Sequence, residues 1–138
     1  FVLVILLMAA YQIGPTVWVV ALPVLILILI MTSLGLGMWL TAMAIQYRDV
    51  RYGITLVTQL LMYGTPVVYP VSLLPERFHL IYAINPMVGV IGGFRSALLG
   101  TTPMPWDLIG IGAATSVTVL LFGSLYFRRM ERTFADVA

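Results

Sequence analysis

A short cationic turn between two long charge-free stretches limits what this chain can fold into. Reading from Phe1, no charged residue occurs before Arg48, and after Arg51 none occurs until Glu76. Apolar stretches of this length on both sides of residues 47–51 are typical of a turn between two membrane-spanning helices. Short loops that carry Arg favour the cytoplasmic side, so this turn also predicts the orientation of the chain.

The composition is that of an integral membrane protein. Apolar residues make up 62% of the chain and charged residues 9%, against roughly half and about a quarter in a soluble domain. All seven positive side chains are Arg, at predicted membrane edges rather than on one basic face, which argues against nucleic-acid binding. The chain has no Cys, which excludes a disulfide, a thiolate nucleophile and a sulfur-ligated metal.

The hydropathy pattern predicts an all-α integral membrane fold, a helical bundle with three full spans. We predict these spans at residues 17–46, 52–69 and 107–127, followed by a cytoplasmic tail at 128–138. Residues 1–13 extend for only about 20 Å as a helix, too short for a core of roughly 30 Å, so they predict a partial span. We expect residues 1–138 to be the C-terminal part of one transmembrane domain, with the missing part N-terminal.

Individual residues predict how the spans are anchored and packed. Trp18 and Trp106 stand where interfacial anchors would lie. Pro23 predicts a kink in the outer part of its helix. Gly35 and Gly37 would allow a neighbouring helix to approach closely.

Residues 75–99 contain an apolar segment that hydropathy alone would count as another span. Asn85-Pro86 interrupts it as a helix break, because Asn is a good N-cap and Pro suits the first helical position. An even number of crossings after Arg51 also returns the arginines of the tail to the cytoplasm. We therefore predict a re-entrant helix pair on the outer side, shielded by protein or lining a watery cavity.

Residue types for catalysis occur without suitable partners. His79 is the single His and has no second ligand at a metal-binding spacing, so no metal site is predicted. The acids fall on both sides of the membrane without a defensible pair, and the Ser and Thr residues lack a base. A phosphate-binding P-loop needs Lys, which the chain lacks, so any ATPase would lie elsewhere. We predict no catalytic residue and no cofactor on this chain.

The polar residues of the span at 52–69 follow helical spacing. Tyr52, Thr55, Gln59 and Tyr63 are three or four residues apart and share one helical face. This polar stripe either lines a path for a substrate or hydrogen-bonds to a neighbouring helix, and the sequence leaves both readings open.

Other candidate residues lie near the two membrane edges. Arg48, Asp49 and Arg51 either couple to a cytosolic partner or form an interfacial anchor. Arg95 falls in the re-entrant segment, where a charge is costly unless paired or wetted. It either holds a phosphate or acidic sugar, or pairs with Glu76 or snorkels to the head groups. The aromatic residues near the outer mouth suit sugar rings or form an interfacial belt: Tyr63, Tyr69, Phe78, Tyr82 and Phe94.

Several motifs follow one another in an order that extends over nearly the whole chain. They are Gln46-Tyr47-Arg48-Asp49-Val50-Arg51, Gln59, Thr65-Pro66-Val67-Val68-Tyr69-Pro70, Pro75, Asn85-Pro86 and Phe94-Arg95. Together they resemble the permease subunit of ABC exporters for polysaccharides such as O-antigen and teichoic acid. Thr65 is a mild departure, since Ser is more often expected there.

The resemblance implies a six-helix permease with cytoplasmic termini, of which this chain supplies the end of the third span through the sixth. It implies a homodimer that encloses a channel for lipid-linked polysaccharide in the bacterial cytoplasmic (inner) membrane. Two separate nucleotide-binding subunits would carry ATP and Mg, and their main docking elements would precede the third span. The re-entrant helices would form an outward gate with possible sugar contacts: Tyr69, Tyr82, Asn85, Pro86, Phe94 and Arg95.

Three other functions remain compatible with the sequence. A related ABC permease could export drugs, peptides or glycolipids. A membrane-embedded enzyme could act on polyprenyl-linked sugars, although no constellation of acids supports it. A structural assembly subunit would use the polar stripe only as a helix contact.

Overall fold

The computed structural model describes residues 8, 10, 11, 14, 16–47, 49–65, 82, 84–100 and 102–135. Within these ranges every element is a helix, which agrees with the predicted all-α class. The elements are a 3-10 helix η1 (Val17–Ala21) and the α-helices α2 (Leu22–Gln46), α3 (Val50–Gly64), α5 (Pro86–Leu99) and α6 (Trp106–Ala135). Most of the partial span at 1–13 and the first piece of the re-entrant segment at 75–99 lie outside the described residues.

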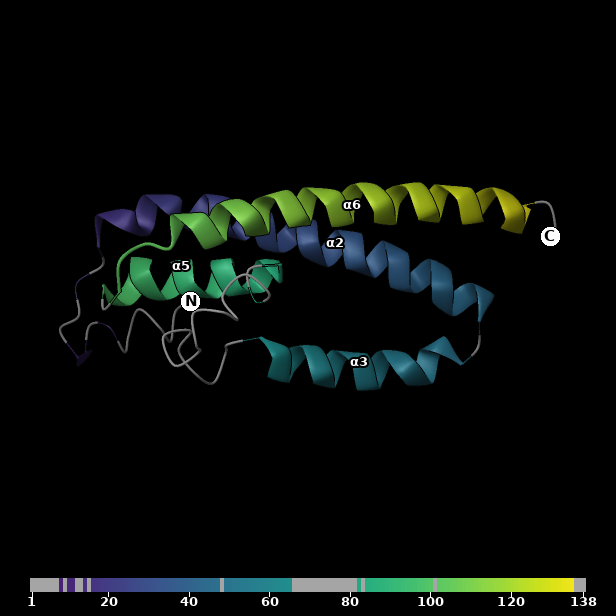
Figure 1. The fold of residues 1–138 in the computed structure, drawn as a ribbon, viewed down its shortest axis with the longest axis horizontal. Coiled ribbons are helices and arrows are strands. Elements are labelled where there is room, and N and C mark those ends of the chain that lie inside the picture. The colour runs from purple at the N-terminus through teal and green to yellow at the C-terminus, as the bar shows by residue number, and fades with distance from the viewer. Residues whose placement is uncertain are drawn as a thin grey trace.

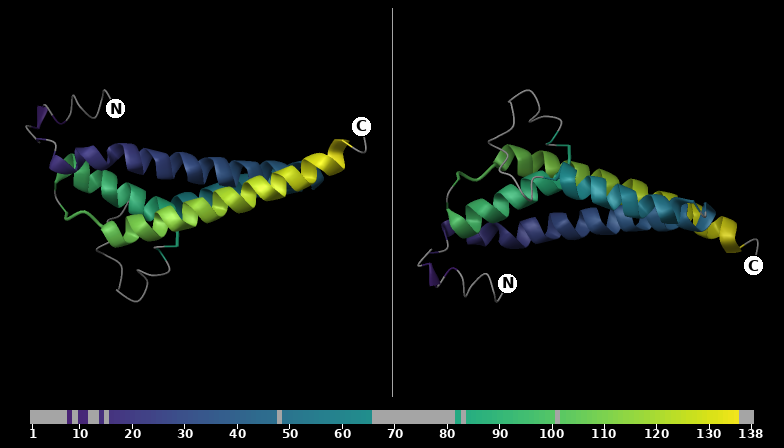
Figure 2. Two further views of the ribbon diagram at one scale, coloured as in Figure 1. Left: turned by 90° about the horizontal axis from the view of Figure 1, so that it is seen from above. Right: turned by 90° about the horizontal axis from the view of Figure 1, so that it is seen from below.

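The long helices α2 and α6 lie side by side and run in the same direction (Figures 1 and 2). The short helix α5 packs against both of them at one end of the bundle, which we name the tryptophan end after Trp18 and Trp106. The helix α3 returns from the opposite end of α2. We name that opposite end the arginine end, after Arg128 and Arg129 near the end of α6. The turn that contains Asp49 lies at the same end.

Two helical stretches are long and apolar enough to cross a membrane. They are Val17–Gln46 and Trp106–Glu131, and only 22% of each tested window is buried. The core helix of a soluble protein would be mostly buried, so the outward apolar surface here is suited to lipid. These stretches correspond to the spans predicted at 17–46 and 107–127.

The helix α3 is shorter than the span predicted at 52–69. It ends at Gly64, and Thr65 is extended, with φ −103° and ψ 134°. Pro66 follows, and a proline disfavours the helical conformation in the residue before it. Residues 66–69 lie outside the described residues, so the crossing itself remains a prediction.

Two other boundaries differ from the predicted ones. Pro23 lies in the first turn of α2, where its missing N–H leaves no hydrogen bond broken, so it marks the change from η1 to α2 rather than a kink within a helix. The helix α6 continues to Ala135 instead of ending at Phe127. Arg, Met and Glu in this extension all favour helix, which explains the added turns.

The backbones of α2 and α6 touch where the two helices cross. A methyl group added to Gly35 would lie 2.7 Å from the Cα atom of Leu120, and one added to Gly123 would meet the carbonyl oxygen of Gly35. Close approach at Gly35 is therefore confirmed. Gly37 has nothing within 4 Å of its added methyl group among the described residues, so the prediction for this glycine stays a prediction.

The hydrophobic core lies between α2, α5 and α6 near the tryptophan end. Its buried members are Leu25, Ile28, Val90, Met104 and Ile109. Phe94 packs against this cluster from α5. The core therefore seats α5 firmly and leaves α3 outside it.

Candidate functional site

The first turn of α5 has the cap that its sequence predicts. Asn85 is the N-cap, with φ −77° and ψ 110°, and its Oδ1 accepts a hydrogen bond from the N–H of Met87 at 3.1 Å. Pro86 follows at the first helical position, where no donor is needed. The helix break predicted at Asn85-Pro86 is confirmed.

The other end of α5 is satisfied by residues from three segments. Gly100 closes the helix with φ 64°, a left-handed conformation that favours glycine, and its N–H donates to Ser96 O at 3.2 Å. The Thr16 hydroxyl makes a bifurcated hydrogen bond to the carbonyl oxygens of Ser96 and Ala97, at 3.0 and 2.5 Å. The Ser96 hydroxyl lies 3.1 Å from Pro103 O and is almost fully buried. Both ends of α5 are thus capped, as an apolar environment requires.

Glycines let α5 sit directly against α6. A methyl group on Gly89 would lie 2.5 Å from the carbonyl oxygen of Leu108, and one on Gly112 would lie 3.2 Å from Pro86 Cα. Pro86 is therefore level with Gly112, which is about 9 Å along α6 from Trp106 at 1.5 Å per residue. The N-terminus of α5 thus lies well inside the bundle, while its C-terminus lies at the tryptophan end.

A buried hydrogen bond joins α2 and α6 at nearly the same level. The hydroxyl oxygens of Thr32 and Ser116 are 2.8 Å apart, and both side chains are buried. Each also lies within hydrogen-bonding distance of the carbonyl oxygen four residues earlier in its own helix. Sequence reasoning missed this pair, although isolated hydroxyls inside long apolar runs are a usable signal.

A cavity of about 400 Å³ lies where α2, α3, α5 and α6 meet. Most of its wall is apolar, and hydroxyl and amide groups interrupt that wall. Its lining consists of Thr32, Leu36, Leu61, Thr65, Ile84, Asn85, Pro86, Met87, Thr115 and Val119. We name it the junction cavity. It brings the predicted gate residues Asn85 and Pro86 next to Thr65, whose part in the site sequence reasoning did not identify.

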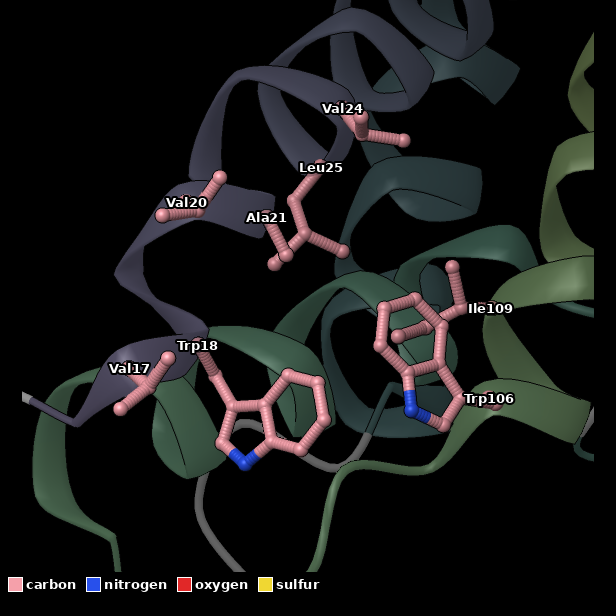
Figure 3. Close-up of a pocket in the computed structure, with 8 residues that line it drawn as sticks. All are labelled: Val17, Trp18, Val20, Ala21, Val24, Leu25, Trp106 and Ile109. Carbon is pink, nitrogen blue, oxygen red and sulfur yellow. The ribbon is translucent and has the colours of Figure 1, made fainter.

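A second cavity of about 420 Å³ opens between η1, α2 and α6 at the tryptophan end (Figure 3). Trp18 and Trp106 stand at its edge with ring centroids 5.6 Å apart and an interplanar angle of 72°. This edge-to-face geometry is favourable for aromatic pairs. Both indoles are about half exposed, as expected for residues that anchor helices at a membrane interface.

The polar stripe lies on the outside of the described bundle. Tyr52 is 84% exposed, and Thr55 and Gln59 are exposed as well. The side chain of Tyr63 lies outside the description. Within the described part of the chain these three exposed side chains have no hydrogen-bond partner. The stripe is therefore available for whatever lies beside α3, and its role remains a prediction.

The other candidate residues are only partly described by the structure. Asp49 is exposed at the start of α3, whereas Arg48 and the side chain of Arg51 lie outside the described residues. Tyr82, Phe94 and Arg95 are half-buried, and Phe94 packs against the core. Tyr69, Glu76, Phe78 and His79 lie outside the description. Among the described residues, no group of three potential ligands could hold a metal ion.

Comparison with known proteins gives consistent relatives. The ABC-2 type transporter family matches residues 1–99. An O-antigen export system permease protein of Myxococcus xanthus is 30% identical over 129 residues, covering 92% of this chain and 50% of the relative. One of Klebsiella pneumoniae is 23% identical over 120 residues, covering 87% and 46%. The chain spans about half the length of these relatives. No solved structure matches it.

Proposed function

Since the chain belongs to the ABC-2 type transporter family, we propose that it is part of the transmembrane subunit of an ATP-driven exporter. Its cargo is a lipid-linked polysaccharide of the O-antigen or teichoic-acid kind. The observation that carries this proposal is similarity to two O-antigen export permeases over about nine-tenths of the chain. The two apolar helices that are long enough to cross a membrane support it.

The energy for export comes from a separate subunit in this proposal. The chain has no Lys and so lacks the P-loop residue that contacts nucleotide phosphates. In this proposal ATP and Mg bind two partner ATPase subunits, which act on a homodimer of the permease. In this proposal Arg48, Asp49 and Arg51 couple to such a partner, and Asp49 is exposed at the start of α3.

Sidedness follows from the position of the charges. The end of α6 that carries Arg128 and Arg129 lies beside the end of α2, because Tyr126 hydrogen-bonds to Gln46. With Asp49 at this same end, we assign the arginine end to the cytoplasm and the tryptophan end to the outer surface of the cytoplasmic (inner) membrane. The C-terminus is then cytoplasmic.

The position of α5 supports its proposed role as an outward gate. Its 14 residues extend for about 21 Å, less than a membrane core of roughly 30 Å. It begins at the junction cavity and ends at the tryptophan end, and both of its termini are capped. In our proposal it is the returning half of the re-entrant pair, and it closes the outer half of the path.

The polar stripe supplies the wall of that path. Tyr52, Thr55 and Gln59 face away from α2 and α6, so a second permease copy could place its own stripe opposite. Hydroxyl, amide and phenol groups exchange hydrogen bonds with sugar hydroxyls without binding them tightly, which suits a moving polymer.

The test uses the full-length protein in the cell that produces it. Deleting it should remove the polymer from the cell surface and leave lipid-linked polymer at the cytoplasmic face, and restoring it should reverse both effects. The purified permease should bring down an ATPase whose turnover rises with lipid-linked polysaccharide. An ATPase stimulated only by drugs, peptides or glycolipids would replace the cargo class. Absence of any ATPase would reject the transporter assignment.

A further inference from the structure

Three helices form one body because their backbones touch. The contacts at Gly35 and Gly123 join α2 to α6, and the contact at Gly89 joins α5 to α6. In a close-packed interior, such contacts leave no space for one helix to tilt without separating from the other. We name α2, α5 and α6 the glycine-packed unit.

Among the described residues, α3 has fewer contacts than the other helices. All its side chains from Tyr52 to Met62 are exposed except the half-buried Ile54, and the helix contacts α2 to only a small extent. Its first turn follows the Tyr47–Asp49 turn at the arginine end. The helix α3 has 15 residues and is about 22 Å long. Because its backbone is hydrogen-bonded throughout, a movement of its N-terminal end is transmitted to its C-terminal end.

Among the described residues, a side-chain hydrogen bond joins the C-terminal end of α3 to the N-terminal end of α5. Asn85 Nδ2 donates to Thr65 Oγ1 at 3.1 Å, while Asn85 Oδ1 accepts from Met87 N–H at 3.1 Å. The Thr65 hydroxyl in turn donates to Leu61 O at 2.7 Å. A continuous chain of hydrogen bonds therefore runs from the last turn of α3 into the first turn of α5.

The surroundings make this bond consequential. Thr65 is only 8% exposed, so water cannot readily replace its partner. Both residues line the junction cavity. Most of its other lining residues belong to α2, α5 and α6, and Leu61 belongs to α3. Loss of this bond would remove a side-chain link between α3 and α5 at the wall of the cavity.

We propose that Asn85 and Thr65 form a latch that holds α3 against α5 and keeps the junction cavity narrow. With the latch closed, a shift of the Tyr47–Asp49 turn pivots α3 about Thr65. With the latch open, α3 moves away from the glycine-packed unit. The idea that export uses this opening rests on the proposed function, whereas the latch itself is a property of the two helices.

The direct test measures how close α3 lies to α5. Leu61→Cys and Met87→Cys place one thiol on each helix at the junction cavity, and the chain contributes no other Cys. In the full-length transporter in its membrane, free of other cysteines, we expect this pair to crosslink. Thr65→Val should slow crosslinking about three- to tenfold, the factor expected for one interhelical hydrogen bond in a membrane. A rate within twofold of the parent would overturn the proposal.

Matched variants separate the latch from ordinary loss of a hydroxyl. Thr58→Val also removes a hydroxyl of α3 that bonds the carbonyl oxygen four residues earlier, Ile54 O, at 2.8 Å, and it should leave crosslinking unchanged. Thr65→Ser keeps the hydroxyl and should behave as the parent. Asn85→Ser keeps a capping oxygen but is too short to reach Thr65, so it should slow crosslinking as Thr65→Val does.

The double variant completes the cycle. Because both substitutions break the same bond, Thr65→Val combined with Asn85→Ser should slow crosslinking no further than either change alone. Additive losses would contradict a shared bond. Crosslinking needs no cargo, so a responsive latch in a protein that exports no polysaccharide would reject the proposed function and keep the latch. Export with an unresponsive latch would do the reverse.

Discussion

The hydroxyl of Tyr126 on α6 donates a 3.3 Å hydrogen bond to Oε1 of Gln46, the last residue of α2. The two residues are 80 positions apart, yet they bring the ends of the two long helices together. Asp49 follows Gln46 closely and Arg128 follows Tyr126, so the charges of both segments gather at one end of the bundle. This juxtaposition supports our proposal that this end of the bundle faces the cytoplasm.

The crossing of α2 and α6 depends on Gly35. We expect Gly35→Ala to destabilise the protein by about 1–3 kcal/mol, because the added methyl group would lie 2.7 Å from backbone atoms of Leu120 that cannot rotate away. Thermal unfolding of the detergent-solubilised protein measures this effect. Gly37→Ala is the matched control, since it has open space and should change stability by no more than about 1 kcal/mol. Equal losses in both variants would contradict the crossing.

The C-terminal carbonyls of α5 depend on Thr16. Thr16→Val should cost about 1 kcal/mol, because the carbonyl oxygens of Ser96 and Ala97 lose a hydroxyl donor and keep only the backbone N–H groups of Gly100 and Thr16. Urea or thermal unfolding provides the measurement. Thr118→Val removes an exposed hydroxyl that bonds only Ala114 O in its own helix, and we expect it to be nearly neutral. A neutral Thr16→Val would mean that water replaces this cap.

The polar stripe is tested by export and assembly together. Gln59→Leu and Tyr63→Ala should each lower export severalfold without lowering the yield of dimer, because in our proposal they remove polar groups from the path and leave the glycine contacts intact. Surface polymer and size-exclusion chromatography report the two quantities. Thr58→Val, on the same helix but outside the stripe, serves as the control. Unchanged export in both stripe variants would remove Gln59 and Tyr63 from the path.

Local sequence signals predicted the local features of the fold. The order Asn85-Pro86 specifies a helix start whatever lies around it, and the structure has that start. The apolar spans predicted at 17–46 and 107–127 correspond to the two long helices. The end of α3 at Gly64 was also readable, since Pro66 disfavours helix at Thr65, but hydropathy alone extended the span to residue 69.

Contacts between distant residues were harder to predict. Gly35 and Gly37 have equivalent sequence settings, and only the direction of α6 decides that Gly35 is at the crossing. The assignment of Phe94 to the outer mouth stays a prediction, and the structure adds that Phe94 packs against the hydrophobic core, which its position in the sequence does not reveal. Thr65 belongs to the site because its hydroxyl accepts a hydrogen bond from Asn85, 20 residues away. These assignments need the three-dimensional arrangement of helices, which hydropathy does not contain.

The central claim is that the segment before α5 and the segment after it open to the same outer surface. In intact cells, single cysteines at positions 79 and 102 of the full-length protein should both react with a membrane-impermeant maleimide. Cysteines at positions 49 and 131 should react only after the membrane is permeabilised. Labelling of position 79 from outside and of position 102 only from inside would contradict the account, because the segment would then cross the membrane.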